Sequence, residues 1–340
     1  MSIARSGKRP STMMAPWFLV ALILSPVTLD RPSPDSQAPA LWAGLTPGPY
    51  RVGYQRLARA GGVVYAWYPT SATGSALRFR DYLGDAAPQL ASFLAKAGTT
   101  RSTIDSLFAS PLYAVPSPRP MDGPFPLVLI AQGNGQDVAD QVVLCEYLAS
   151  KGFVVTTTPS PMLRSPLERE DQVGAFAETQ AAELAAATRA VAAVFPVDLQ
   201  RLAVVGHSFG ARAALLLAMQ DRRIRAIVSL DGGIGTATAV EPFRRAPSFR
   251  ADAALPPLLH FYEELDAFMT PDFGMLRSLH TAELLLERTD AMHHMHFTTY
   301  GFAVALFPDL ARATHATSAT ARAAAGVEER TATFLDHWLR

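Results

Sequence analysis

The chain of 340 residues has one cysteine, Cys145, and only three lysines, and its 30 Lys and Arg residues are balanced by 30 Asp and Glu residues. A single cysteine excludes an intramolecular disulfide. Zero net charge, with no run of basic residues, argues against a nucleic-acid partner. Charged residues make up only 18% of the chain and hydrophobic residues 49%, which excludes an extended disordered protein. We therefore expect a globular protein with a substantial core.

The N-terminus lacks an uninterrupted apolar run long enough to span a membrane. Three basic residues precede an uncharged segment at 13–29, which is broken by Pro16 and Pro26. A secretory signal has a basic segment followed by an apolar one, so we expect 1–29 to be a signal peptide or N-terminal anchor. We expect 30–49 to be a disordered linker. The expected location is secreted or periplasmic, with cleavage before about residue 41. Membrane association through the apolar segment is the alternative.

From residue 50 onward, β-branched runs alternate with alanine-rich helical patterns, which predicts a single domain at 50–340. Several of the runs are apolar throughout, as in parallel strands covered on both faces. The expected fold class is α/β, a doubly wound, mostly parallel sheet with helices on both faces and a helical insertion at about 81–120. The expected strands are 63–67, 127–131, 153–157, 202–205, 226–230, 258–262 and 282–286, and the expected helices are 138–150, 168–194, 209–219 and 327–339.

The strongest local signal is the segment Gly206-His207-Ser208-Phe209-Gly210, which follows an expected strand and opens an expected helix. A serine on such a tight strand-to-helix turn has a strained backbone, and glycines flank it because strand and helix pass closely there. The turn holds the Ser208 hydroxyl above the sheet. We therefore predict Ser208 to be a nucleophile.

A nucleophilic serine needs a histidine base and a carboxylate that orients this base. Three histidines, His293, His294 and His296, lie in the loop after the last expected strand. We expect one of them to be the base, and we expect no metal site. Two carboxylates compete for the acid, because Asp231 and Asp266 each follow an expected strand at the edge where parallel sheets bind ligands. The pattern alone leaves both open.

An oxyanion hole needs two backbone N–H groups near the nucleophile. The amide of Phe209, directly after the serine, is the first expected donor. The second should come from the loop after the strand 127–131, and we expect it to be the amide of Asn134.

Taken together, these segments resemble the α/β-hydrolase superfamily, and within it the platelet-activating-factor acetylhydrolase-like branch of the dienelactone-hydrolase group. The resemblance runs from about residue 48 to the C-terminus. It is carried by 48–53, 67–69, 125–128, 148–155, 206–210 and 230–232. The branch implies an acid after the strand 226–230, which favours Asp231 over Asp266. It also implies a His-x-x-Phe pattern at the base, which favours His294 over His293. Gln132 and Ala211 depart from the branch, which usually has a histidine and a glycine at these positions.

The resemblance implies a serine-dependent carboxylic ester hydrolase that acts through an acyl-enzyme on short-acyl or phospholipid-like esters, as in lipid degradation. It implies no cofactor, and the expected partner is a small-molecule ester. An acyltransferase or amidase with the same triad is one alternative, and a non-catalytic exported binding module on a hydrolase fold is another. The sequence predicts no oligomeric state.

Overall fold

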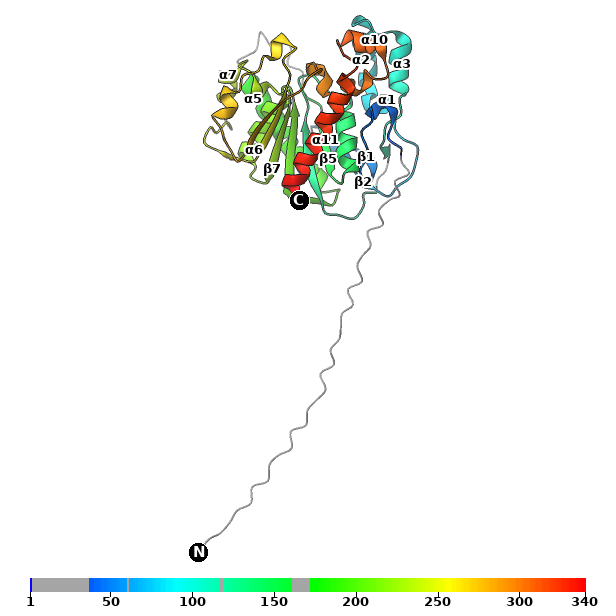
Figure 1. The fold of residues 1–340 in the computed structure, drawn as a ribbon. Helices are drawn as coiled ribbons and strands as arrows, with labels where there is room; N and C mark the ends of the chain where they lie inside the picture. The colour runs from blue at the N-terminus through cyan, green and yellow to red at the C-terminus, as the bar shows by residue number, and fades with distance from the viewer. Residues whose placement is uncertain (2–36, 60, 117–118, 161–171) are drawn as a thin grey trace. The chain divides into compact units, whose positions relative to one another are not determined.

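The computed structural model describes Met1 and residues 37–340 apart from 60, 117–118 and 161–171, and within the unit Pro32–Arg340 it contains a nine-stranded sheet (Figure 1). The strand order is β11-β9-β7-β6-β4-β5-β2-β1-β3. The strands are β1 Arg51–Arg59, β2 Gly62–Thr70, β3 Val115–Pro116, β4 Phe125–Ala131, β5 Val154–Thr157, β6 Val197–His207, β7 Ile224–Leu230, β9 Leu258–Tyr262 and β11 Leu284–Arg288. The pairs from β5 through β4, β6, β7 and β9 to β11 are parallel, whereas β2 is antiparallel to both β1 and β5.

Helices cover both faces of the sheet because its central strands are apolar on both sides. Along β4, Val128 and Ile130 belong to the core cluster under α4 and α11, while Leu127 and Leu129 belong to the cluster under α5 and α6. The helices are α1 Phe79–Leu83, α2 Ala87–Lys96, α3 Arg101–Ala109, α4 Val142–Ser150, α5 Val173–Ala192, α6 Gly210–Gln220, α7 Val240–Arg244, α8 Gly274–Arg277, α9 Thr299–Ala303, α10 Pro308–Ala313 and α11 Thr320–Leu339. The expected fold class, a doubly wound and mostly parallel sheet, is confirmed.

The differences from the expected elements lie mainly at their ends. The helix expected at 138–150 begins as a 3-10 turn, Val138–Gln141, before α4, and α11 begins seven residues earlier than expected. Strand β1 was not expected, because it contains a single β-branched residue, Val52, and three arginines. It forms through its full-length antiparallel pairing with β2, and burial of Val52 and Tyr54 fixes its inward face.

The expected insertion contains the helices α1, α2 and α3, which Figure 1 shows beside α10. Asp309 of α10 joins the two groups. Its carboxylate accepts hydrogen bonds from the backbone N–H and hydroxyl of Thr100, each at 2.8 Å, and from the Thr103 hydroxyl at 2.7 Å. Asp309 thus satisfies a donor at the N-terminus of α3 and fixes the insertion to the C-terminal part of the chain.

The prediction of a disordered linker at 30–49 is wrong for residues 37–49, the part that the structure describes. Leu41, Trp42 and Leu45 are at most 1% exposed, and the indole N–H of Trp42 donates to Glu146 of α4 at 3.3 Å. The same carboxylate accepts from the Tyr82 hydroxyl at 2.6 Å. The proline content of the segment suggested disorder, but its few large apolar side chains bury enough surface to hold it on the domain.

Within the residues that the structure describes, no helix combines the length and the apolar character needed to cross a membrane. The segment 1–29, predicted to be a signal peptide or anchor, lies outside the described residues apart from Met1.

Candidate active site

Ser208 lies on the turn between β6 and α6, at the carboxyl edge of the parallel strands. Its backbone is left-handed, with φ of 53°. A Cβ at Gly206 would lie 2.6 Å from the backbone of Ala211, and one at Gly210 would lie 2.1 Å from the carbonyl oxygen of Ala131. Both positions therefore require glycine, as the sequence predicted from the close passage of strand and helix.

His294 and Asp231 join Ser208 in one chain of hydrogen bonds. His294 Nε2 lies 2.9 Å from Ser208 Oγ, and its Nδ1 lies 2.6 Å from Asp231 Oδ2. Asp231 follows β7, with a left-handed φ of 42°, and His294 opens the 3-10 helix η7, His294–Phe297. The structure thus brings together the residues that the sequence proposed as nucleophile, acid and base, drawn from three separate loops.

The acid is sealed from solvent more tightly than the base. The side chain of Asp231 is 2% exposed and that of His294 is 8% exposed. Burial raises the pKa of Asp231, although the hydrogen bond from His294 acts in the opposite direction. A buried carboxylate held against an imidazole fixes the ring's tautomer and its direction.

Asp266, the competing carboxylate, does not contact the His294 ring. Its Oδ1 lies 2.9 Å from His293 Nδ1, and its Oδ2 accepts a hydrogen bond from the backbone N–H of His294 at 2.8 Å. Burial acts to raise the pKa of Asp266, but the hydrogen bonds from His294 and His293 outweigh it and hold this pKa below its usual range. Asp266 therefore fixes the loop that carries His294.

His207 and Phe268 pack on the His294 ring. The His207 ring stacks on it with centroids 4.8 Å apart, and Phe268 meets it edge-on at 5.2 Å. Burial lowers the pKa of His207 well below its usual range, so His207 is neutral and places no cation beside the base. Neither residue was predicted to have a role from the sequence, although His207 lies inside the elbow motif.

The two expected oxyanion donors lie on neighbouring segments. Phe209 immediately precedes α6, and Asn134 is exposed on the loop after β4. Gly133, next to Asn134, donates its N–H to Gln136 Oε1 at 2.6 Å, and His207 Nδ1 lies 2.9 Å from the same oxygen. That oxygen can only accept, and it lies closer to the ring than the His294 carbonyl oxygen, which is 3.3 Å from Nε2. The single proton of the neutral His207 ring therefore lies on Nδ1, and the elbow is tied to the loop through Gln136.

Gln132 stands where the branch that the sequence resembles usually has a histidine, and its side chain forms part of the support of this loop. Its Nε2 donates to Thr157 Oγ1 of β5 at 3.2 Å, while its backbone carbonyl oxygen accepts from Gln180 Nε2 of α5 at 2.8 Å. The substituted residue therefore attaches the loop to both a strand and a helix.

Glu263 is a further residue that the sequence analysis did not single out. It is fully buried, and its carboxylate accepts hydrogen bonds from the backbone N–H groups of Leu265 and Asp266. Burial raises its pKa. It holds the loop that presents Asp266 and Phe268. A polar pair after a strand, Glu263-Glu264, was the only sequence signal for it.

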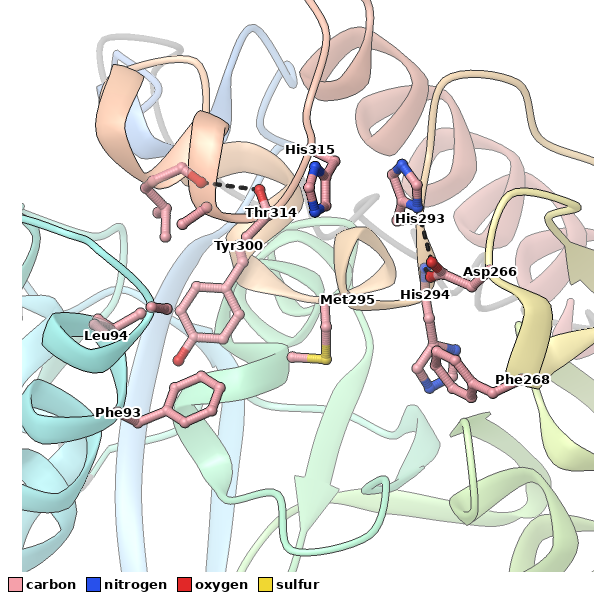
Figure 2. A pocket seen from close by; sticks show the side chains of 13 residues that line it. Phe93, Leu94, Asp266, Phe268, His293, His294, Met295, Tyr300, Thr314 and His315 are labelled. Carbon is pink, nitrogen blue, oxygen red and sulfur yellow. Dashed lines mark hydrogen bonds and ion pairs between the residues drawn. The ribbon is translucent and has the colours of Figure 1, made fainter.

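A groove of about 290 Å³ adjoins the base, lined by His294, Phe268 and side chains from α2, η7, α9 and α10 (Figure 2). Among the residues that the structure describes, no group of three or more histidine, cysteine or acidic side chains could hold a metal ion.

Two comparisons with known proteins bear on this arrangement. A family model described as PET hydrolase-like matches residues 116–236, a stretch that includes Asn134, Ser208 and Asp231 but ends before Asp266 and His294. The solved structure of a ferulic acid esterase from Streptomyces cinnamoneus is similar to this chain with a TM-score of 0.63 and 23% identity, over 91% of this chain and 93% of that one. A search of curated proteins gives no match. At this identity the structural likeness shows the fold, and together with the family model it bears out the resemblance predicted from the sequence: the chain has the α/β-hydrolase fold.

Proposed function

We propose that this protein is a carboxylic ester hydrolase that acts through a serine acyl-enzyme. The observation that carries the proposal is the hydrogen-bond chain from Ser208 through His294 to Asp231, with links of 2.9 and 2.6 Å. The matching family is described by PET hydrolysis and the similar structure is named an esterase. These names support ester hydrolysis over amide hydrolysis or acyl transfer, which the same triad could perform.

In the proposed reaction, His294 Nε2 accepts the hydroxyl proton as Ser208 Oγ attacks the ester carbonyl carbon. The carbonyl oxygen becomes an oxyanion, which the N–H groups of Phe209 and Asn134 would stabilise. His294 then protonates the leaving alkoxide, and the acyl group remains on Ser208. Water, deprotonated by His294, attacks the acyl carbonyl carbon; the bond to Ser208 Oγ breaks, His294 returns the proton to this oxygen, and the acid is released. Asp231 stays ionised and holds Nδ1–H throughout.

The resemblance to the acetylhydrolase-like branch extends the proposal to short acyl groups. In that branch the acid follows the strand that corresponds to β7. Asp231 lies directly after β7, whereas Asp266 follows β9. A non-catalytic binding module is the weaker alternative, because such a module has no need for a serine, a base and an acid aligned at hydrogen-bond distance.

The direct test replaces the nucleophile. Ser208→Ala should lower kcat for hydrolysis of p-nitrophenyl acetate by about 10³-fold or more, because no other group can form the acyl-enzyme. The matched control is Ser106→Ala, which removes an exposed hydroxyl of α3. A fluorophosphonate probe, mapped by mass spectrometry, should label wild type and the control at Ser208 and leave Ser208→Ala unlabelled. Near-wild-type turnover by Ser208→Ala would refute the proposal.

We also propose that the protein is exported, on the basis of the basic and apolar order of residues 5–29. Cleavage at the small residues 38–40 would leave the buried Leu41, Trp42 and Leu45 on the mature chain. The intact mass of protein from its native host should match a chain that begins near residue 41. A full-length cytosolic product would contradict export.

A further inference from the structure

The groove beside His294 has two chemically different ends (Figure 2). One end carries polar side chains, with His293 paired to Asp266 and His315 nearby. The rest is apolar and is formed mainly by Phe93, Leu94, Phe268, Met295, Tyr300 and Leu310. The rim is apolar as well, because Phe93 and Phe268 are 63% and 64% exposed. Exposed aromatic side chains that line a groove are typical of a site that binds an apolar ligand.

The groove lies on the His294 side of the triad. Its lining includes the base, His294, but not Ser208 or the two expected oxyanion donors, Phe209 and Asn134. In ester hydrolysis the base must reach the oxygen of the departing alcohol, whereas the carbonyl oxygen must face the oxyanion donors. A substituent on the leaving oxygen is therefore directed toward the His294 side.

We propose that this groove binds the alcohol portion of the ester, and that this portion is an uncharged aryl or alkyl group with one oxygen acceptor in its apolar body. This inference rests on the proposed function of Ser208 and His294. The volume of about 290 Å³ is near the lower end for small-molecule sites, so it fits one substituted ring or a chain of similar size.

The charges around the groove exclude an anionic alcohol. No arginine or lysine is among the residues that line it, and Asp266 already binds His293 and the His294 backbone. A phosphate or carboxylate buried here would lose its hydration without gaining an arginine or lysine partner, which is costly. The groove therefore favours a neutral alcohol over the phospholipid-like substrates that the family resemblance also allowed.

Tyr300 supplies the single polar contact expected inside the apolar part. Its side chain is 6% exposed and lines the groove. Figure 2 shows this hydroxyl directed away from His293 and His315. Burial raises its pKa well above the usual value, so the hydroxyl stays neutral and can donate. Buried tyrosine hydroxyls normally have a partner, and an ether, carbonyl or hydroxyl oxygen of the alcohol would provide one.

The experiment uses two ester series with the full protein. The alcohol series is ethyl, benzyl, 4-methoxybenzyl and 4-carboxybenzyl acetate, and the acyl series is ethyl acetate, butyrate and hexanoate. The variants are Phe93→Ala, which changes an exposed position on α2, and Tyr300→Phe, which removes only the hydroxyl. The control is Val194→Ala. Val194 is 49% exposed and precedes the amino end of β6, whereas Ser208 follows the carboxyl end of the same strand.

Wild type should prefer benzyl to ethyl acetate in kcat/KM and should disfavour the 4-carboxybenzyl ester. Phe93→Ala should lower the benzyl-to-ethyl ratio about 10-fold while leaving the acyl-chain preference unchanged. Tyr300→Phe should lower the 4-methoxybenzyl-to-benzyl ratio about 10-fold, since a site built to donate a hydrogen bond loses this discrimination with the donor. Val194→Ala should change neither ratio.

A change of acyl-chain preference in Phe93→Ala, with the alcohol preference intact, would overturn the assignment and make the groove an acyl site. Unchanged ratios in both variants, in an active enzyme that labels at Ser208, would refute the groove proposal alone. If wild type hydrolyses none of the esters and does not label at Ser208, the proposed function fails, and the groove proposal fails with it.

Discussion

Two neighbouring histidines each bind a carboxylate, but in different surroundings. The pair of His294 with Asp231 has side chains 8% and 2% exposed, and the pair of His293 with Asp266 has side chains 23% and 24% exposed. Only the first pair reaches Ser208, through His294 Nε2. In the second pair Asp266 also holds the His294 backbone N–H at 2.8 Å. One carboxylate thus directs the ring of the base, and the other positions the chain that carries it.

The difference appears in the pKa of each acid. Burial raises the pKa of Asp231, so ionised Asp231 is costly in the folded state, whereas hydrogen bonds hold the pKa of Asp266 low, so ionised Asp266 stabilises the fold. A costly buried charge is characteristic of a group kept for chemistry, and a stabilising partly exposed charge is characteristic of a structural one. The comparison therefore predicts opposite effects of neutralising the two acids.

The largest effect is expected from Asp231→Asn. Loss of the carboxylate leaves the His294 tautomer unfixed and the imidazolium unstabilised, so kcat for p-nitrophenyl acetate should fall by about 10⁴-fold. The folded state should be as stable as wild type or more stable, because removing a buried charge of raised pKa removes a cost at pH 7. Urea unfolding and circular dichroism at pH 7 check the stability.

Asp231→Asn with wild-type kcat, beside a crippled Asp266→Asn, would reverse the roles of the two pairs. It would then place this protein with hydrolases whose acid follows the strand β9.

Sequence patterns predicted the central part of the fold better than its periphery. Strands β4, β7 and β9 and the second half of β6 are mainly apolar, so their composition alone identified them. Strand β1 and the segment that carries Trp42 were missed because their order comes from tertiary contacts, namely pairing with β2 and burial of an indole against Glu146. Local propensity has no access to such contacts.

The candidate site divides in the same way. A motif with its own local geometry, the elbow at Ser208, could be recognised from the sequence, and the structure shows the left-handed turn that the motif requires. The choice between Asp231 and Asp266 could not be made from residue patterns, because both follow parallel strands and both bind the same loop. Packing partners such as Phe268, and supports such as Gln136 and Glu263, depend on distances between separate loops. The catalytic roles of all these residues stay predictions.

A smaller effect is expected from Asp266→Asn. The amide can still accept one hydrogen bond, but it loses the charge that strengthens the bonds from His293 and from the His294 backbone. The His294 loop should become less well positioned, so kcat should fall about 10-fold, far less than for Asp231→Asn. The matched control, His293→Gln, alters the partly buried ring partner of Asp266 and leaves the backbone bond to His294, and its kcat should stay within about threefold of wild type. Equal losses in the two variants would mean that the His293 ring, rather than the backbone bond, carries the effect.

Stability measured against pH sharpens this last prediction. Because the pKa of Asp266 is lower in the folded chain than the usual value of about 3.9, the ionised carboxylate stabilises the fold above that pH, and the stabilisation is lost as the pH falls through the folded pKa. Asp266→Asn should therefore unfold in urea with a free energy about 1 kcal/mol lower than wild type at pH 7. The difference should shrink below about pH 4, where wild type also becomes protonated. Asp231→Asn should show no such loss at pH 7, because the pKa of Asp231 is shifted in the opposite direction. If the difference in free energy of unfolding between Asp266→Asn and wild type stays constant from about pH 7 to pH 3.5, the stability lost in the variant comes from packing and not from the charge of Asp266.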